Sequence, residues 1–225
     1  VVPATIAEGG RRPRVRVRWG VHMRRDAREE NTAMPKIVDH EERRQQIVDT
    51  FLTLVERGRG LDAASSRALA AELGISNSLL WRYFKDMDEI VERAYREVVA
   101  HTNARIERGI AGRHGLDAVH ALIDELMPVT DASKAEACVV VAYWAAKTRD
   151  GHSYVEPHDC WRTKLVAFLE EARGMGQVAD DCPARVLADA VVDIVDNAQV
   201  EYVMAGDDRL ALEARDLARA IVRLH

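Results

Sequence analysis

The sequence has little of what most redox, metal-binding or membrane proteins need. Its three cysteines, Cys138, Cys160 and Cys182, lie about 22 residues apart, which leaves no close pair for a metal or redox site. We expect reduced, buried thiols, with a thiol-based sensor as the alternative. No apolar run approaches the roughly 18 residues of a membrane-spanning helix, so we expect no membrane partner.

Catalytic patterns are also missing. The chain has no nucleophile elbow, no phosphate-binding glycine loop and no paired acid–base site, and Ser153 with His158 does not make a triad. Residues 152–160 are rich in metal-ligating types, but their spacing fixes no coordination geometry, which favours a polar loop. We therefore expect a protein that is not an enzyme, with no catalytic residue, no metal and no cofactor. The sequence shows no secretory signal pattern, so we expect a cytoplasmic protein.

Residues 1–33 differ in composition from the rest of the chain. They contain eight arginines against four acidic residues, with glycines and prolines but no helical period, and we expect them to be disordered. An alternation at residues 15–19 would suit a strand, but no partner strand is visible. Two interpretations stay open. The segment is an arginine-rich arm that lies in a DNA minor groove, or, as we favour, upstream sequence included by a misassigned start.

The most informative segment is residues 66–83, SRALAAELGISNSLLWRY. A short helix ends near Leu73, Gly74 can adopt the left-handed conformation that stops it, and Ser76 is a natural N-cap for the next helix. Ala70 is small where two helices would cross. The pattern predicts a helix-turn-helix, the unit that places its second helix in the major groove of DNA.

The residues that follow make this pattern more specific. Asp86 and Glu89 form a capping box for a further helix. With its segments SSRALAAELGIS, LLWRYF and DEIV, the stretch 44–94 resembles the N-terminal domain of the TetR family of regulators. The resemblance implies an all-α dimer with a three-helix helix-turn-helix head at residues 34–100. It also implies a helical-bundle body at 101–225 for effector binding and dimerisation.

The helix after the turn is expected to have an inward and an outward face. Leu80, Tyr83 and Phe84 share the inward face. The outward face is expected to hold Asn77, Ser78, Trp81 and Arg82. Arg82 can donate two hydrogen bonds to guanine and Asn77 can bond to adenine, and either side chain could instead contact only phosphate. Residues 34–100 have a net charge of −2, so we expect a locally basic face and not a basic domain.

Two residues depart from the family pattern. The family usually has tyrosine at the position of Trp81, and the indole N–H can keep its phosphate contact. It often has lysine at the position of Met87, and Lys85 is the nearest substitute. Ser65 is the expected N-cap of the preceding helix, and Ser65 and Arg67 suit phosphate contacts at its start. The DNA-binding candidates are Ser65, Arg67, Ser76, Asn77, Ser78, Trp81, Arg82, Tyr83 and Lys85.

Capping and stop signals predict the other helices. Asp39 and Glu42 form a capping box for the first helix, which glycines 58 and 60 end. Glycines at 109, 112 and 115 mark a boundary between head and body. The body helices are expected at Leu116–Met127, Ser133–Thr148, Tyr154–Arg173, Cys182–Met204 and Asp207–Leu224.

The last two of these helices have wide apolar faces with near-heptad spacing, typical of packing against a second copy. In TetR-like proteins these helices form the four-helix bundle of the dimer. The alternative is that both faces are covered inside the monomer. The predicted interface is Leu187, Val191, Ile194, Val195, Ala198, Tyr202, Leu210, Ala214, Leu217 and Ile221.

The body is also expected to hold an effector pocket, because ligand sites are common in the cores of helical bundles. The candidates are the aromatic residues of the central helices, with plain core packing as the alternative. A cavity lined by several of them would suit an apolar or a cationic ligand, the latter through cation–π attraction. Trp144 and residues 193–202 resemble the branch of the family linked to choline and betaine metabolism. The candidate pocket residues are Tyr143, Trp144, Tyr154, Trp161 and Phe168.

The leading hypothesis is a dimeric repressor that leaves a near-palindromic double-stranded DNA operator when a small-molecule effector binds. One alternative is a regulator or activator that binds DNA without an effector. Another is a helical small-molecule-binding protein whose helix-turn-helix pattern is coincidental. Salt-sensitive binding to duplex DNA separates the last hypothesis from the first two.

Overall fold

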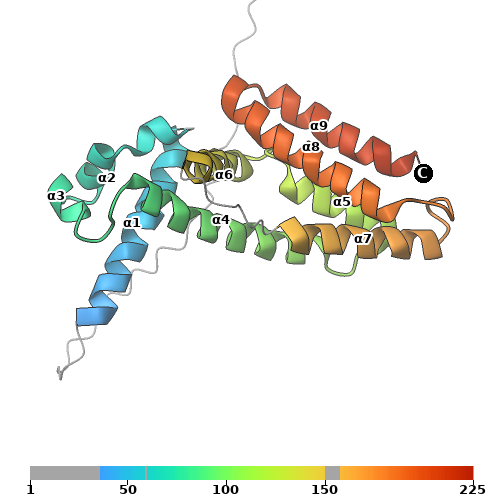
Figure 1. Ribbon diagram of the computed structural model, residues 1–225, viewed down its shortest axis with the longest axis horizontal. Coiled ribbons are helices and arrows are strands. Elements are labelled where there is room, and N and C mark those ends of the chain that lie inside the picture. Colours follow the sequence, from blue (N-terminus) through green and yellow to red (C-terminus); the bar gives the residue numbers. More distant parts are fainter. Residues whose placement is uncertain (1–35, 59, 150–157, 225) are drawn as a thin grey trace, which may run out of the picture. The chain divides into compact units, whose positions relative to one another are not determined.

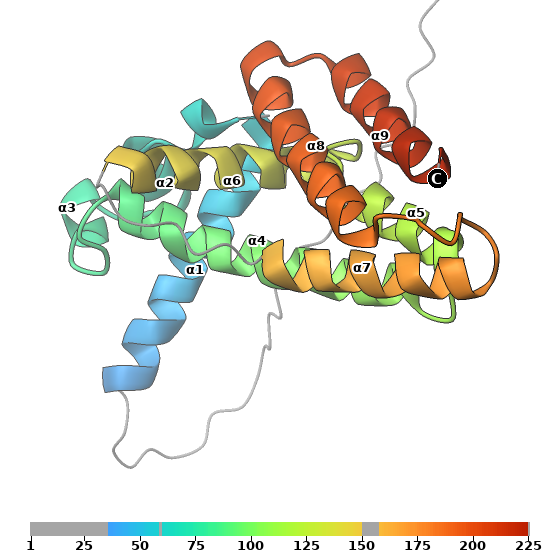
Figure 2. The ribbon, with the colours of Figure 1, turned by 45° about the vertical axis from the view of Figure 1, so that its right-hand side comes forward.

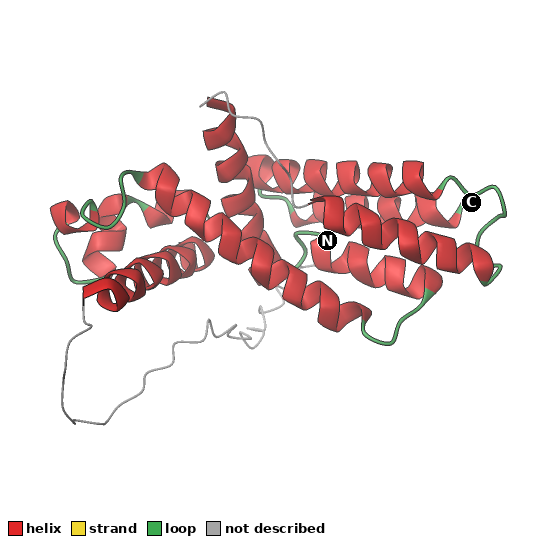
Figure 3. Ribbon diagram, turned by 60° about the horizontal axis from the view of Figure 1, so that its bottom comes forward, coloured by secondary structure: helices red, strands yellow, loops and turns green. Residues whose placement is uncertain are grey.

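The computed structural model describes residues 36–58, 60–149 and 158–224, which belong to one compact unit. Within these ranges every regular element is helical and no strand occurs (Figure 3), so the expected all-α fold is confirmed. The elements are α1 (Lys36–Gly58), η1 (Leu61–Ala64), α2 (Ser66–Glu72), α3 (Asn77–Leu80), α4 (Met87–Ile110), α5 (Gly115–Leu126), α6 (Asp131–Arg149), α7 (His158–Gly174), α8 (Ala184–Ala205) and α9 (Asp208–Arg223).

Two serines begin the helices of the helix-turn-helix, as the sequence predicts. The hydroxyl of Ser65 accepts a hydrogen bond from the backbone N–H of Ala68 at 3.3 Å. The hydroxyl of Ser76 accepts one from the N–H of Leu79 at 3.2 Å. Each bond satisfies an N–H group that a helix start leaves without an intrahelical partner.

The capping box of α4 is also present, and tertiary contacts extend it. The carboxylate of Asp86 accepts from the N–H of Glu89 at 2.9 Å, and that of Glu89 accepts from the N–H of Lys85 at 2.7 Å. Arg44 of α1 donates to Glu89 at 2.5 Å. The hydrogen bond from Lys85, followed by that from Arg44, holds the pKa of Glu89 below its usual value. The start of α4 is thereby tied to α1.

Two helix starts differ from the expected ones. α1 begins at Lys36, so Asp39 lies inside the helix, because no proline or glycine separates the two positions. α6 begins at Asp131, before the expected Ser133. Thr130 and Ser133 cap it reciprocally, since each hydroxyl accepts from the other residue's N–H at 3.0–3.1 Å.

The expected boundary between residues 100 and 101 falls inside α4, which runs unbroken from Met87 to Ile110. We call α1 to α3 the head and α5 to α9 the body, and α4 belongs to both. It packs against α1 on the head side and against α5 and α6 on the body side (Figures 1 and 2). The two regions are therefore joined by a continuous helix.

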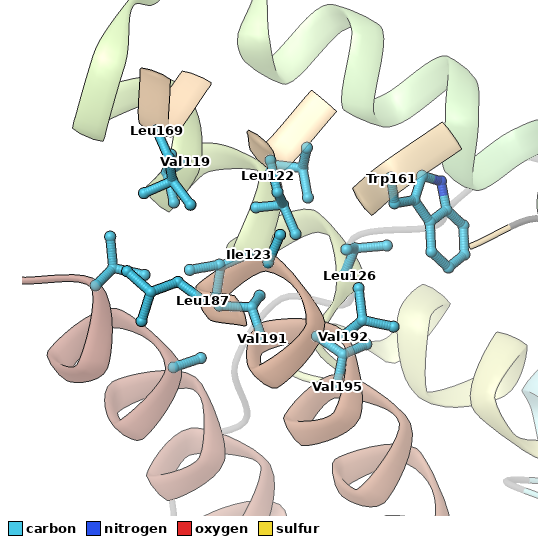
Figure 4. Close-up of a cluster of buried hydrophobic side chains, with 14 of the residues drawn as sticks. Val119, Leu122, Ile123, Leu126, Trp161, Leu169, Leu187, Val191, Val192 and Val195 are labelled. Carbon is cyan, nitrogen blue, oxygen red and sulfur yellow. The ribbon is translucent and has the colours of Figure 1, made fainter. Parts of the chain in front are cut away.

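Two hydrophobic cores hold these regions together. Phe51, Leu69 and Leu80 are fully buried in the head, where Cys138 and Val139 of α6 join them. The body core gathers side chains from α5, α7 and α8, among them Leu122, Leu169 and Val191 (Figure 4). Because α6 supplies side chains to the head core and also packs on α8, it is a second connection between head and body.

The cysteines only partly match the expectation. Cys138 and Cys182 are buried, but Cys160 is exposed near the start of α7. Desolvation raises the pKa of the Cys160 thiol above its ordinary value, which disfavours the reactive thiolate. No described helix is long and apolar enough to cross a membrane. Within the same ranges, no three metal-ligating side chains come together in a way that could hold an ion.

Some predictions fall outside the described residues. They concern the tail at 1–33 with its alternation at 15–19, the pocket candidate Tyr154, and the side chains of the polar stretch at 152–158.

Candidate nucleic-acid interface and effector cavity

The turn between α2 and α3 has the geometry that the sequence predicts. Gly74 has a φ of +64°, in the left-handed region, and its N–H donates to the carbonyl of Ala71 at 3.1 Å. The N–H of Ile75 donates to the carbonyl of Ala70 at 2.9 Å, and Ala70 is buried beneath this reversal. These contacts fix the direction in which α3 leaves the turn.

The recognition segment is shorter as a helix than expected, and its two faces match the prediction at Leu80, Phe84, Asn77, Ser78 and Arg82. α3 ends at Leu80, and hydrogen-bonded turns continue to Phe84, whose N–H donates to the carbonyl of Leu80 at 3.3 Å. Leu80 is 0% and Phe84 is 2% exposed, so both anchor the segment in the head core. The opposite side is solvent-exposed at Asn77, Ser78 and Arg82.

Basic side chains surround this exposed side. Residues 65–85 contain three basic side chains and a single acidic one, Glu72, which pairs with Arg57 of α1 at 2.8 Å. Arg67 and Arg82 are exposed, and neither makes an ion pair with any described residue. Lys85 is also exposed, with a contact of 3.6 Å to Asp86. The segment therefore offers free cations to an anionic partner.

The two aromatic candidates sit at the edge of this surface. Trp81 and Tyr83 are half-buried and pack against the head core. Tyr83 is therefore less deeply buried than expected, and Trp81, expected on the outward face, is partly covered. The ring of His40, on α1, lies 4.9 Å from that of Tyr83. Sequence reasoning did not include His40, because no local pattern brings the start of α1 to the recognition segment.

A cavity lies in the body, where α4, α5, α6, α7 and α8 meet. Its enclosed space amounts to about 30 Å³, room for roughly two water molecules, and the space at its opening to solvent brings the total to about 420 Å³. Tyr95 and Trp161 form the aromatic part of the cavity wall. The indole N–H of Trp161 donates to the side-chain carbonyl of Asn103 at 2.7 Å. The polar lining residues are Thr102, Arg105, Glu125, Ser133, Glu136 and Gln199.

An ion-pair network crosses this cavity. Arg105 of α4 donates to Glu136 of α6 at 2.5 Å and to Glu125 of α5 at 3.2 Å, while Thr102 donates to Glu136 at 3.3 Å. Burial alone would lower the pKa of Arg105, but the two carboxylates outweigh that effect and raise it. The network therefore joins three helices at the body end of α4.

The structure brings one of the predicted pocket aromatics to this cavity, Trp161. Tyr143 instead stacks on Tyr95, with ring centroids 3.9 Å apart. Trp144 and Phe168 are half-buried and do not line the cavity. The polar lining was missed because its members are separate residues on different helices, with no common spacing in the sequence.

The predicted dimer face is corrected in part. Leu187, Val191, Val195 and Ala198 are at most 5% exposed and belong to the monomer's own core, where other helices of the same chain cover them. Periodicity identified an apolar face but not which element packs on it. The remaining candidates are half-buried or exposed, with Leu217 54% exposed. The outer surface of the α8–α9 hairpin has further exposed apolar side chains, namely Val186, Met204, Leu212 and Leu224.

Comparison with known proteins identifies this arrangement. The sequence profile of the bacterial regulatory proteins of the tetR family matches residues 57–94, which contain the helix-turn-helix. The HTH-type transcriptional regulator PksA of Bacillus subtilis (strain 168) is 32% identical over 184 residues, covering 79% of this chain and 88% of PksA. The chain belongs to the tetR family.

Other tetR-type proteins are more distant. The HTH-type transcriptional regulator BetI of Serratia proteamaculans (strain 568) is 24% identical over 116 residues, 50% of this chain and 58% of BetI. A transcriptional regulator of Saccharomonospora viridis, solved in complex with choline, has the same fold. Its TM-score is 0.65 at 19% identity, covering 81% of this chain and 96% of that one. As a member of the tetR family, the chain is a DNA-binding transcriptional regulator and not an enzyme.

Proposed function

We propose that this tetR-family regulator is a dimeric repressor, released from a near-palindromic operator when a small molecule binds in the body cavity. The proposal rests on one observation, namely that the recognition segment has a buried side and an exposed side. Leu80 and Phe84 anchor it in the core, while Asn77, Ser78 and Arg82 are exposed to solvent. None of these three side chains belongs to the head core, which is the property expected of a reading surface.

In this proposal the exposed residues have two roles in DNA recognition, contact with bases and contact with phosphates. Arg82 and Asn77 bond to base edges in the major groove. Ser65, Arg67, Trp81 and Lys85 contact phosphates and fix the orientation of the head. The Ser65 hydroxyl can donate to a phosphate while it accepts from Ala68, since a hydroxyl both donates and accepts. Ser76, Ser78 and Tyr83 complete the surface.

Dimerisation through the outer surface of α8 and α9 supplies the second head. Met204 is 81% and Leu224 is 80% exposed, so a second copy that covered them would remove apolar surface from water, which favours association. The proposed interface keeps Ile194, Tyr202, Leu210, Ala214, Leu217 and Ile221 and adds Val186, Met204, Leu212 and Leu224.

Release by an effector follows from the position of α4. The helix begins at Met87, directly after the recognition segment, and Thr102 and Arg105 on its body half line the cavity. A ligand that prefers one arrangement of these side chains would shift α4 and thereby the spacing of the two heads. Such coupling of two sites through one shared element is allosteric in the thermodynamic sense.

Selection of bound duplexes from a random pool tests the DNA part of the proposal. The expected product is an inverted repeat whose half-sites lie about 34–36 Å apart, or a multiple of that spacing. Recovery of no enriched sequence at physiological salt would contradict operator recognition. Recovery of a single, unrepeated site would contradict the two-headed arrangement.

Sedimentation of a surface variant tests the dimer. The double substitution Met204→Asp and Leu217→Asp places two charges on the proposed interface and is expected to convert the protein to monomers at micromolar concentration. Met175→Asp is the matched control, because Met175 is 54% exposed but lies between α7 and α8. Equal sedimentation of both variants as dimers would remove this interface from the proposal.

A further inference from the structure

The polar interior of the molecule is concentrated in one place. Thr102, Ser133, Glu136 and Gln199 are each 5–8% exposed and are the buried polar or charged residues found in the described ranges. All four line the body cavity. Buried polar groups cost free energy unless they are paired, so a cluster of them around a hollow indicates a built site.

Gln199 is the member of this cluster that the protein leaves without a partner. Its side chain is on α8 and lines the cavity, and its residue exposure is 7%. Within the described part of the chain, its side-chain amide makes no hydrogen bond. By contrast, Thr102 donates to Glu136, and Ser133 caps α6 with Thr130. An amide turned into a cavity at this depth is a hydrogen-bonding group for a bound molecule.

The charges of the lining are unbalanced. Glu125 and Glu136 provide two carboxylates, and Arg105 provides one guanidinium. The lining thus has one formal negative charge in excess. Because an uncompensated charge is costly in a partly buried site, the cavity favours an occupant that brings a positive charge.

We infer that the body cavity binds a small organic cation with a primary ammonium group. The ammonium donates to the carboxylates of Glu136 and Glu125 and to the side-chain carbonyl of Gln199. Its carbon skeleton lies against Tyr95 and Trp161. This inference rests on the effector role proposed above and specifies the chemistry of that ligand.

The hydrogen-bonding capacity of the lining favours an N–H-bearing cation over other ligands. A primary ammonium has three donors, which match the acceptors of two carboxylates and one amide. A quaternary ammonium has no donor and leaves the Gln199 carbonyl without a partner. A carboxylate ligand would need Arg105, whose guanidinium is already shared by Glu125 and Glu136.

Three compounds of similar size test the chemistry on the full chain without DNA. Ethanolamine has a primary ammonium, choline is the same skeleton with three N-methyl groups, and glycolate is an anion. Thermal shift and the indole N–H resonance of Trp161 report binding. Ethanolamine is expected to bind at least tenfold more tightly than choline, and glycolate not to bind. Tighter binding of choline or of glycolate, or no binding of ethanolamine at 10 mM (roughly a 3 kcal/mol limit), would overturn the inference.

Variants then locate the site. Gln199→Leu is expected to weaken ethanolamine binding about tenfold while the protein stays folded, because that amide has no partner to lose. Glu136→Gln is expected to weaken it more, since it removes a charge. Glu201→Gln is the control, because Glu201 is exposed on the same helix and does not line the cavity. Unchanged affinity in Gln199→Leu and Glu136→Gln would place ethanolamine outside this cavity and refute the assignment.

A wrong ligand assignment and a wrong proposed function give different experimental results. If ethanolamine does not bind, the selected operator is still recovered, and only the ligand assignment is lost. If ethanolamine binds in the cavity but leaves operator affinity unchanged, the cavity assignment stands and this ligand's role in release is contradicted.

Discussion

The recognition segment of the head and the cavity of the body are built in opposite ways. The head surface comes from residues 65–85, one continuous stretch whose caps and turn are local. The cavity comes from residues between 95 and 199 on five helices. In the head, anchoring and exposed side chains alternate along a short segment. In the body, the polar side chains of the cavity also join the helices.

This difference has a consequence for mutation. Because Asn77 and Arg82 are exposed and lie outside the head core, a change there should alter DNA binding and leave stability alone. Arg105 and Glu136 bond to each other and line the cavity, so a change there should affect both binding and stability. Separate measurement of the two properties therefore tests the comparison.

The largest effect is expected where the recognition segment is anchored. Leu80→Ala removes a fully buried side chain and should lower the free energy of unfolding by ~2–5 kcal/mol, measured by urea denaturation. Leu79→Ala is the matched control on the same helix, since Leu79 is only half-buried and should cost clearly less. Equal losses in the two variants would contradict the inward and outward faces assigned to α3.

A smaller effect is expected on the exposed side. Arg82→Ala should weaken operator binding by ~1–3 kcal/mol if the side chain bonds to a base, with no change in thermal stability. Arg185→Ala makes the same change of charge at an exposed position of α8 and should leave binding intact. An unchanged band shift for Arg82→Ala at fixed salt would remove Arg82 from base recognition.

Substitution of the turn glycine, Gly74, should lower the free energy of unfolding by a comparable or smaller amount, because its backbone conformation disfavours other residues. Gly74→Ala puts a Cβ atom on a residue with φ of +64°, where no neighbouring atom lies within 4 Å, and should cost ~1–2 kcal/mol of stability. Gly174→Ala, at the end of α7, has equal space without the positive φ and should instead stabilise by ~0.4–1 kcal/mol. Chemical denaturation of both variants measures this. Two changes of the same sign would mean that the turn conformation is not strained for alanine.

The last prediction concerns pH and the body. Burial raises the pKa of Asp196 on α8 to about 7, with Arg162 opposing and Asp193 adding to the shift. The folded protein therefore holds this proton more tightly than the unfolded chain, where the carboxyl titrates near 3.8. The stabilising contribution is fully present below the unfolded pKa of 3.8 and is lost progressively as the pH rises from there to about 7.

Asp196→Asn should remove this part of the pH dependence. The difference in melting temperature between pH 5 and pH 8 should be smaller for the variant than for the unchanged protein. Glu201→Gln, at an exposed position on the same helix, should keep the full difference. An identical pH dependence in Asp196→Asn would show that the buried carboxyl does not titrate in this range.

Local features of the sequence predicted the helix-turn-helix well. Ser65, Ser76 and Asp86 cap the helices that they were expected to cap, and Gly74 adopts the expected left-handed conformation. Each of these interactions spans at most three or four residues, so the sequence contains both partners close together. The exposed face of α3 followed from the same local geometry.

The body was predicted less completely because its decisive contacts are distant in sequence. Val191 and Val195 have the spacing of an interface, but the structure covers them with the monomer's own helices. Arg105 and Glu136 lie 31 positions apart, and neither has a distinctive neighbour. No spacing rule could have paired them or turned Gln199 toward the same cavity.

The sequence by itself determined that this chain is all-α and that residues 66–83 turn in the manner of a DNA-reading unit. Helix caps, a glycine in the left-handed conformation and the spacing of apolar residues each involve only a few neighbouring residues. They therefore depend little on the rest of the chain. Only the tertiary structure decided which faces of α8 and α9 stay exposed and where the buried polar groups converge. Those outcomes depend on which helix packs against which, and packing is a property of the whole chain.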